Sequence, residues 1–244
     1  MAILTYNIYH GEDANGNSNL DAVAKIINSH EPDLVALQEV DNKTTRAKGL
    51  DLTAELIART GMKGVFGKAM DYAGGGYGEA VLSRHAILDT KSNLLPHTPN
   101  AEPRAALEVR VKLPTGERLV FVATHLDHLR DQRNRMMQAG RIKELYEGCR
   151  LPVILAGDLN AVPGSDPMNL LAEEWTCASQ GNPEPTAPSA KPTRKIDYIM
   201  YKPQARWRVV ETRVIDEKIA SDHCPVFAVL ELLPGSRNAR QSLK

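Results

Sequence analysis

Short hydrophobic runs recur along this chain, and a polar side chain stands at or near one end of each. Runs of this length, bounded by glycine, proline or polar residues, are typical of buried β-strands. In extended backbone, residues two apart point to the same side, so Asp158 and Asn160 at the end of one run share a direction. The six runs and their polar residues are 3–6 with Asn7, 33–38 with Glu39, 119–124 with His125 and Asp127, 151–156 with Asp158 and Asn160, 195–201 with Asp197, and 224–230 with Asp222 and His223.

Between these runs, hydrophobic residues at helical spacing predict four helices. The first covers 20–28 after the cap-forming Asn19, and the second covers 50–59 and stops before Gly61. The longest is expected over 131–147, and a short one opens at Ser165, with Pro167 in its first turn.

The remaining segments complete the fold prediction. Residues 82–122 follow a strand-after-strand pattern with a hairpin turn at 114–116, and 181–192 have the composition of a loop. A long antiparallel stretch within an α/β frame predicts a sandwich of mixed sheets with helices outside. No linker divides the chain, so one domain is expected over 1–233, followed by a polar tail over 234–244.

The strand ends are the predicted functional region, because ligands in layered α/β folds bind where a rigid sheet holds its loops. Asp158 and Asn160 offer an anionic acceptor and a neutral donor to one small ligand, such as a phosphate with its metal ion. Any single case is more typical of a capped turn or a solvated strand end, but six cases with complementary chemistry favour a shared site.

Composition narrows the function classes only modestly. The 244 residues carry 30 basic and 30 acidic side chains, so no strong field attracts a polyanion, which counts against a general DNA-binding protein. Three scattered cysteines predict ordinary thiols. No hydrophobic stretch is long enough to span a bilayer, and no signal peptide is visible. The chain is therefore expected to be cytoplasmic, or secreted after removal of an upstream signal, and its localisation stays open.

The motifs, taken together and in order, resemble the endonuclease/exonuclease/phosphatase family, the DNase I-like superfamily. The segments that carry the resemblance are Leu-Thr-Tyr-Asn7, Leu-Gln-Glu39, Thr-His125-Leu, Gly-Asp158-Leu-Asn160, Ile-Asp197-Tyr and Ser-Asp222-His223. The resemblance spans nearly the whole chain. It implies a four-layer α/β sandwich, with two stacked mixed β-sheets flanked by helices, and divalent-metal-dependent hydrolysis of a phosphoester.

A metal site is expected at the first strand ends. Glu39 is a hard oxygen ligand suited to Mg²⁺ or Mn²⁺, and Asn7 adds an amide oxygen. The resemblance implies that Asp222 completes this site. The alternative for Glu39 is a salt bridge with Arg46 or Lys43, which is less favoured because Glu39 ends a buried run.

Two histidines, His125 and His223, match the catalytic pair of the family. A catalytic imidazole usually needs a carboxylate that fixes its tautomer. The resemblance pairs His223 with Asp197, and the segment Tyr77-Gly-Glu79 suggests Glu79 for His125. Asp158 is expected to orient or deprotonate the attacking water while Asn160 holds a phosphoryl oxygen. The other histidines are expected to be ordinary core or surface residues: His10, His30, His85, His97 and His128.

Further residues are candidates for binding the substrate phosphate. Arg104 resembles a phosphate-contacting arginine of the family, and a planar guanidinium suits bidentate phosphate binding; a plain surface arginine is the alternative. Residues 74–78 predict a flexible substrate-side loop, in which Tyr77 stacks or donates a hydrogen bond. The arginines that open the long helix, Arg130, Arg133 and Arg135, are expected on a solvated face or beside the cleft.

The sequence thus predicts a metal-dependent phosphoesterase, expected as a monomer, that acts on a small or lipid-linked phosphodiester. A nuclease is the enzyme alternative; it is less favoured because the chain is neutral and only 5% aromatic. A non-catalytic binding protein on the same fold is a second alternative. A serine or cysteine hydrolase is a third, although the chain has no Gly-x-Ser-x-Gly motif.

Overall fold

A computed structural model of the chain describes residues 1–181 and 183–235. In these residues the hydrophobic runs form strands of two six-stranded sheets. The first sheet has the order β11-β12-β1-β2-β4-β3, and the second has the order β5-β6-β7-β8-β10-β9. The strands of the two sheets are β1 (Ala2–Asn7), β2 (Leu34–Asn42), β3 (Lys63–Tyr72), β4 (Gly75–Ser83), β5 (Ala86–Leu95), β6 (Arg104–Lys112), β7 (Arg118–His125), β8 (Val153–Asp158), β9 (Thr176–Cys177), β10 (Asp197–Lys202), β11 (Trp207–Val214) and β12 (Val226–Leu232).

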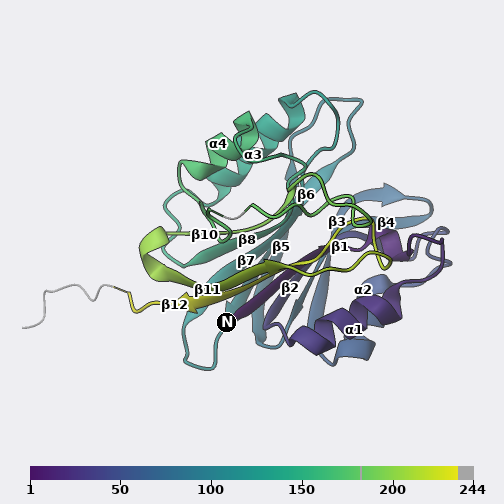
Figure 1. Cartoon of the computed structure of the whole chain (residues 1–244), viewed down its shortest axis with the longest axis horizontal. Coiled ribbons are helices and arrows are strands. Elements are labelled where there is room, and N and C mark those ends of the chain that lie inside the picture. The colour runs from purple at the N-terminus through teal and green to yellow at the C-terminus, as the bar shows by residue number, and fades with distance from the viewer. Residues whose placement is uncertain (182, 236–244) are drawn as a thin grey trace, which may run out of the picture.

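Helices cover the outer face of each sheet, so the fold has four layers (Figure 1). The four α-helices predicted from the sequence are present, with ends shifted by up to two residues. They are α1 (Leu20–His30), α2 (Leu52–Thr60), α3 (Arg133–Leu145) and α4 (Asp166–Ala172), and two short 3₁₀ turns lie at Tyr9–Gly11 and Gln204–Arg206. None of the helices in the described part of the chain is long and apolar enough to cross a membrane.

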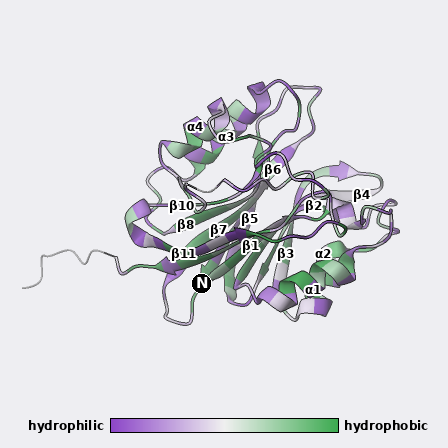
Figure 2. Ribbon diagram, in the orientation of Figure 1, coloured by the Kyte–Doolittle hydropathy of each residue, from purple (hydrophilic) through white to green (hydrophobic). Residues whose placement is uncertain are grey.

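Three hydrophobic clusters hold the layers together. One lies between the two sheets and includes Phe121 and Ile154. The second joins α1 and α2 to the first sheet, and the third joins α3 and α4 to the second sheet. The central strands are largely hydrophobic along their length, as expected for strands covered on both faces, while the helices carry both hydrophobic and hydrophilic residues (Figure 2). The predicted DNase I-like sandwich is confirmed.

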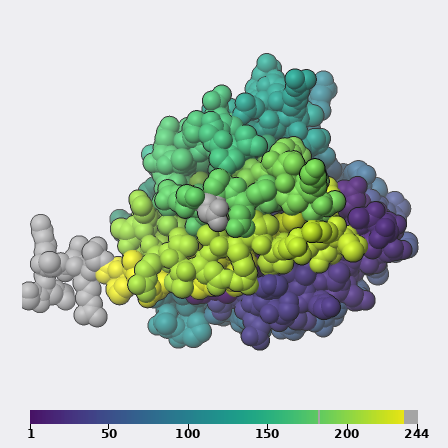
Figure 3. Space-filling view, viewed as in Figure 1, coloured from purple at the N-terminus to yellow at the C-terminus, as the bar shows by residue number. Residues whose placement is uncertain are grey.

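The C-terminal segment ties the two halves of the fold together. Strand β12 pairs with β1, so the last strand of the chain lies beside the first. Figure 3 shows this yellow segment lying between the purple N-terminal region and the green segment that follows β8. The loop before β12 therefore reaches the end of β1, where the hydroxyl of Ser221 donates a 2.6 Å hydrogen bond to the carbonyl of Asn7.

The glycine-rich segment 74–78 is not the flexible loop that the sequence suggested. From Gly75 onward it forms β4, paired on both sides with β2 and β3. A β-carbon on Gly78 would lie 2.1 Å from the carbonyl oxygen of Gly67, and one on Gly75 would lie 2.3 Å from that of Asn42. Glycine occurs here because neighbouring backbones approach closely, which sequence alone does not distinguish from loop flexibility. The predicted tail falls mostly on 236–244, outside the described residues.

A similar close approach lies directly before Asp158. A β-carbon on Gly157 would lie 1.9 Å from the carbonyl oxygen of Thr124 in the neighbouring strand β7. We therefore expect Gly157→Ala to lower the free energy of unfolding by about 3 kcal/mol, because β7 and β8 must separate to admit the methyl group. Urea unfolding of the purified variant measures this change.

Gly140 provides the matched control. It lies within α3, and nothing lies within 4 Å of the position its β-carbon would occupy. Gly140→Ala should leave stability unchanged or raise it by up to about 1 kcal/mol, because alanine is the better helix former. A Gly157→Ala protein as stable as the parent would contradict the steric argument.

Candidate active site

Three strand ends and a bulge within a fourth strand meet at one side of the sandwich. Asn7 ends β1 and Glu39 lies in β2 of the first sheet, while His125 ends β7 and Asp158 ends β8 of the second. Parallel pairing sets His125 beside Asp158, and antiparallel pairing sets Asp197 on the other side of Asp158. The polar residues that follow separate hydrophobic runs in the sequence are thereby brought to one place.

A cavity of about 400 Å³ lies between these strand ends. The residues that the sequence predicted and that line it are Glu39, Tyr77, Arg104, His125, Asp158, Asn160, Asp222 and His223. The other three predicted residues, Asn7, Glu79 and Asp197, are buried. All of the predicted residues therefore lie in or next to one pocket. Only the predicted pairing of Glu79 with His125, described below, is not found.

The backbone around the cavity is strained at residues other than glycine. Glu39 has a φ of 57°, and Asn160 and His10 each have a φ of 46°. At Glu39 the pairing of β2 with β4 shifts between Leu37 and Val40, which marks a β-bulge. Each such position costs about 1–3 kcal/mol, and such positions concentrate at functional sites. The side chains of Glu39 and Asn160, whose backbone is strained, point into the cavity rather than along the sheet.

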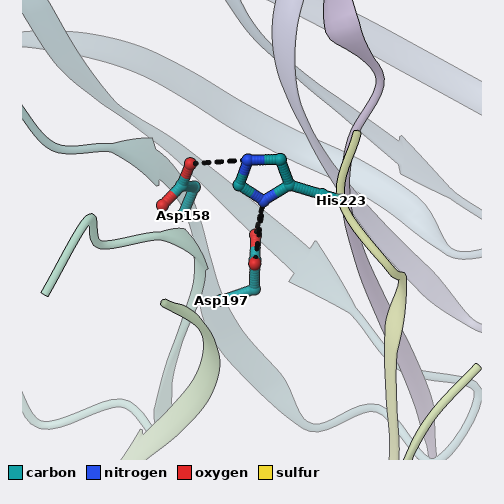
Figure 4. A group of neighbouring side chains, drawn as sticks. All are labelled: Asp158, Asp197 and His223. Carbon is teal, nitrogen blue, oxygen red and sulfur yellow. Dashed lines mark hydrogen bonds and ion pairs between the residues drawn. The ribbon is translucent and has the colours of Figure 1, made fainter. Parts of the chain in front are cut away.

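His223 is held between two carboxylates (Figure 4). Its Nδ1 lies 2.9 Å and 3.1 Å from the two oxygens of Asp197, and its Nε2 lies 3.7 Å from Oδ2 of Asp158. Thr186 donates a 2.5 Å hydrogen bond to Asp197, which fixes that carboxylate in turn. The pairing of His223 with Asp197 that the family resemblance implied is present in this geometry.

This arrangement shifts the pKa of both partners in the cavity. Burial alone would lower the pKa of His223, but the charges of Asp197 and Asp158 outweigh it and raise the pKa to about 10. Burial, together with the charge of Asp197, raises the pKa of Asp158 above that of an ordinary carboxylic acid. A cationic imidazole beside a carboxylate of raised pKa is a pair that can exchange a proton.

His125 has different neighbours. Its Nδ1 lies 2.9 Å from Nη1 of Arg104, and its Nε2 lies 3.3 Å from Oδ2 of Asp158 and 2.9 Å from Nδ2 of Asn160. Burial and the adjacent Arg104 charge hold the pKa of His125 well below its usual range. The two histidines beside Asp158 are therefore electrostatically unlike, although the sequence suggested a symmetric pair.

The structure does not pair Glu79 with His125, contrary to the sequence-based expectation. Arg104 occupies the Nδ1 side of the ring, and no contact joins Glu79 to His125 in the described residues. Glu79 is 1% exposed and its Oε2 has no hydrogen-bond partner there. Burial raises the pKa of Glu79 well above its usual range. The reason for the error is that an arginine on β6 reaches the same space, which no local motif reveals.

The residues expected to hold a metal ion also lie together. Oε1 of Glu39 accepts a 2.9 Å hydrogen bond from Asn7, whose amide nitrogen also lies 3.3 Å from Asp158. His10 lies 3.6 Å from Glu39 and, with the other nearby donors and cations, outweighs burial and lowers the pKa of Glu39 to about 2. Neither Arg46 nor Lys43 pairs with Glu39, since Arg46 is bonded to Asp41.

Two sets of side chains offer ligands for a divalent ion. Asp158, Asp197 and His223 offer one ligand atom each, and these atoms lie within 4.8 Å of one another. Binding there would compete with the hydrogen bond between His223 and Asp197. Glu39, Asn7 and the exposed Asp222 offer oxygen atoms only, and an ionised Glu39 suits a hard cation. This set has the oxygen chemistry that hard divalent cations prefer, and Oδ1 of Asn7 accepts a 3.1 Å hydrogen bond from the backbone N–H of Tyr9.

Tyr72, Tyr77 and Arg46 form an aromatic wall of the cavity. Arg46 donates two hydrogen bonds to the buried Asp41 and lies 4.7 Å and 5.7 Å from the ring centres of Tyr72 and Tyr77. Tyr72 is 39% exposed. The ion pair with Asp41 fixes Arg46, so this wall is preorganised rather than flexible.

Sequence reasoning missed several residues that line the cavity. His10 and His128 were expected to be ordinary, and Tyr72, Arg46 and Arg194 were not assigned to the site. A signal was available for the two histidines, because each follows a strand-end residue by three positions.

The residues Arg130, Arg133 and Arg135 are not part of the cavity wall. The last of these is buried and donates hydrogen bonds to the carbonyls of Asp127 and Leu129.

Comparisons with known proteins agree with this site and fold. The sequence pattern of the Endonuclease/Exonuclease/phosphatase family matches residues 4–223. An uncharacterized protein of Caenorhabditis elegans is 28% identical over 187 residues, which cover 66% of this chain and 53% of that protein. The chain thus spans about half the length of this curated relative.

Solved structures show the same architecture. A conserved protein of unknown function from Enterococcus faecalis superposes with a TM-score of 0.81 at 26% identity, covering 95% of this chain and 100% of the other. A mannosyl-6-phosphatase from Bacteroides thetaiotaomicron superposes with a TM-score of 0.75 at 21% identity, covering 95% and 100%. The superpositions show the fold, and the family pattern spans nearly the whole chain, so the protein belongs to the Endonuclease/Exonuclease/phosphatase family, whose members are hydrolases that act on phosphoester bonds.

Proposed function

We propose that this protein is a divalent-metal-dependent phosphodiesterase that cleaves a small or lipid-linked phosphodiester. The observation that supports it most is the placement of Asp158 between two histidines at the cavity, 3.3 Å from His125 and 3.7 Å from His223. Hydrolysis of a phosphoester needs a group that accepts a proton from water, a group that protonates the leaving oxygen, and donors for the phosphoryl oxygens. This cluster supplies all three.

The proton transfers follow from the pKa shifts. Asp158, whose pKa is raised, accepts a proton from the attacking water as the water oxygen bonds to phosphorus. His223 is cationic and gives its Nε2 proton to the leaving oxygen as the phosphorus–oxygen bond breaks. Its partner Asp197 holds the ring through Nδ1, so the ring cannot turn away. The proton on Asp158 then returns to His223, which restores both groups.

The remaining residues bind and neutralise the phosphoryl group. We assign Asn160 and the neutral His125 as hydrogen-bond donors to phosphoryl oxygens, with Tyr77 in the facing wall. Glu39, Asn7 and Asp222 are the proposed metal ligands. When bound, Mg²⁺ or Mn²⁺ supplies positive charge that stabilises the phosphoryl oxygens in the transition state.

The dimensions of the site favour a small substrate. A cavity of about 400 Å³ is at the low end of the range for sites that hold a whole small molecule. The chain has no net charge, whereas a protein that grips duplex DNA usually presents a basic face. The family resemblance by itself fits a phosphomonoester as well, since the mannosyl-6-phosphatase shares this fold.

A nuclease is the second candidate, and the aromatic wall is the observation that favours it. The half-exposed ring of Tyr72 lies beside Arg46, and both line the cavity. Aromatic and guanidinium groups of this kind bind nucleobases by stacking. The terminal nucleotide of a nucleic-acid strand would fit the cavity. Binding it would not require a basic face that holds the rest of the nucleic acid.

The primary test is hydrolysis of bis-p-nitrophenyl phosphate with Mg²⁺ or Mn²⁺. We expect turnover that EDTA abolishes, and His223→Ala should lower kcat by about 100-fold or more, because the leaving oxygen loses its proton donor. His97→Ala, an exposed histidine outside the cavity wall, should behave as the parent. Faster cleavage of p-nitrophenyl phosphate would instead indicate a monoesterase. EDTA-resistant turnover that a thiol reagent abolishes would rule out the metal mechanism.

The metal assignment is tested separately by isothermal titration with Mn²⁺. Glu39→Gln should weaken binding about tenfold or more, because the neutral amide loses the charge that attracts the ion. Glu55→Gln, on the surface of α2, is the matched control and should bind Mn²⁺ as the parent does. Equal affinity in the parent and Glu39→Gln would remove Glu39 from the proposed site.

The aromatic wall is tested with two diesters that share a leaving group. Tyr72→Ala should raise KM for thymidine 5′-(p-nitrophenyl phosphate) by about 5-fold to 100-fold if the base stacks on this ring, and leave KM for methyl p-nitrophenyl phosphate unchanged. Tyr72→Phe keeps the ring and should behave as the parent. No difference between the two diesters in Tyr72→Ala would argue against the nuclease candidate.

A further inference from the structure

Arg104 is held in an unusual way for a residue in the wall of a phosphate site. Its side chain is 2% exposed, at the start of β6. Its Nη1 lies 2.9 Å from Nδ1 of His125 and 3.1 Å from Oε1 of Glu102, and its Nη2 lies 3.2 Å from Nδ1 of His128. The guanidinium of Arg104 thus contacts Nδ1 of both His125 and His128, and both histidines line the cavity.

The polarity of these hydrogen bonds fixes the proton on each ring. A guanidinium has N–H donors and no acceptor, so each Nδ1 that faces Arg104 must carry a lone pair. A neutral imidazole with an unprotonated Nδ1 carries its proton on Nε2. His125 and His128 are therefore Nε2–H tautomers. His223 is the reverse case, because the acceptor Asp197 requires a proton on its Nδ1.

Asn160 lies on the other side of the His125 ring. Its Nδ2 donates a 3.1 Å hydrogen bond to the carbonyl of Leu126, which fixes the amide orientation, and the same atom lies 2.9 Å from Nε2 of His125. Because the Leu126 carbonyl accepts from this amide, Asn160 does not need a lone pair on Nε2, whereas the guanidinium of Arg104 offers only donors to Nδ1. The contact with Arg104 therefore decides the tautomer, and the Nε2 proton of His125 has an acceptor in Asp158 at 3.3 Å.

These contacts leave Arg104 poorly placed for two-point phosphate binding. Nη1 bonds to His125 and lies 3.1 Å from Oε1 of Glu102 in an ion pair, and Nη2 bonds to His128. The Nε atom is buried and has no hydrogen-bond partner in the described residues. A bidentate clamp through Nη1 and Nη2 would have to give up one of these contacts.

His128 gains a role from the same geometry. It is exposed, lines the cavity, and makes no side-chain hydrogen bond other than the one with Arg104 in the part of the chain that the structure describes. Its Nε2–H is thus free to donate to an oxygen of a bound ester. A neutral N–H donor binds a phosphoryl oxygen without bringing another charge next to Arg104 and the cationic His223.

We propose that Arg104 is a positioning residue that fixes His125 and His128 as Nε2–H donors, and that His128 is an additional substrate-binding residue on this wall of the cavity. The inference rests on the proposed phosphoesterase function for the role of His128. The tautomers themselves do not depend on that function, so the two parts can be tested separately.

The tautomers are read by long-range ¹H–¹⁵N correlation spectra of the ¹⁵N-labelled full chain, in which protonated and unprotonated ring nitrogens are well separated. His125 and His128 should each show an unprotonated Nδ1, and His223 should show a protonated one. In Arg104→Lys both rings should lose the single tautomer, because one ammonium group cannot reach two rings as a guanidinium fork does. His97 should be unchanged. A protonated Nδ1 on His125 in the parent, or unaltered rings in Arg104→Lys, would overturn the positioning role.

Steady-state kinetics on bis-p-nitrophenyl phosphate test the binding role. His128→Asn should raise KM about tenfold and change kcat by less than about twofold, since the lost contact is to bound substrate and not to the transferred proton. His97→Asn is the matched control and should match the parent. An unchanged KM in His128→Asn would overturn the binding role. Absence of turnover in the parent would count against the phosphoesterase itself, while the tautomer spectra would still decide the role of Arg104.

Discussion

The carboxylate of Asp158 is the point on which the site depends, because both sheets and the C-terminal loop meet there. The first sheet reaches it through Asn7, the second through His125, and the loop before β12 through His223. A buried carboxylate is costly unless donors and cations surround it. The residues that satisfy Asp158 are therefore the same ones to which the proposed mechanism gives a role, so under that proposal stability and chemistry constrain the same positions.

The pKa values of the two histidines beside Asp158 are shifted in opposite directions. His223 faces a carboxylate, which raises its pKa, whereas His125 faces an arginine, which lowers it. In the proposed mechanism, His223 then carries the transferable proton while His125 remains a neutral donor. Two equivalent imidazoles beside Asp158 would compete for one proton, and the unlike partners remove that competition.

The predictions from sequence succeeded where a residue's position along its own strand was enough. A hydrophobic run predicts a buried strand, and a polar residue directly after it predicts a strand end, so Asn7, His125 and Asp158 could be found without coordinates. The same reasoning failed for Glu79 and for the glycines of 74–78, because these depend on what a neighbouring strand brings close. Arg104 reaches His125 from β6, and the backbone of β3 crosses next to Gly78.

The sequence by itself determined the layered sandwich, the family and the strand ends at which the chemistry is placed, since local periodicity and ordered motifs encode all three. Only the tertiary structure decided which partner each histidine meets, that His10 and His128 line the cavity, and that Arg46 supports an aromatic wall. The physical reason is distance along the chain. Arg104 is 21 residues from His125, and His223 is 26 from Asp197, so their hydrogen-bond polarity is set by strand pairing and loop return rather than by neighbouring residues.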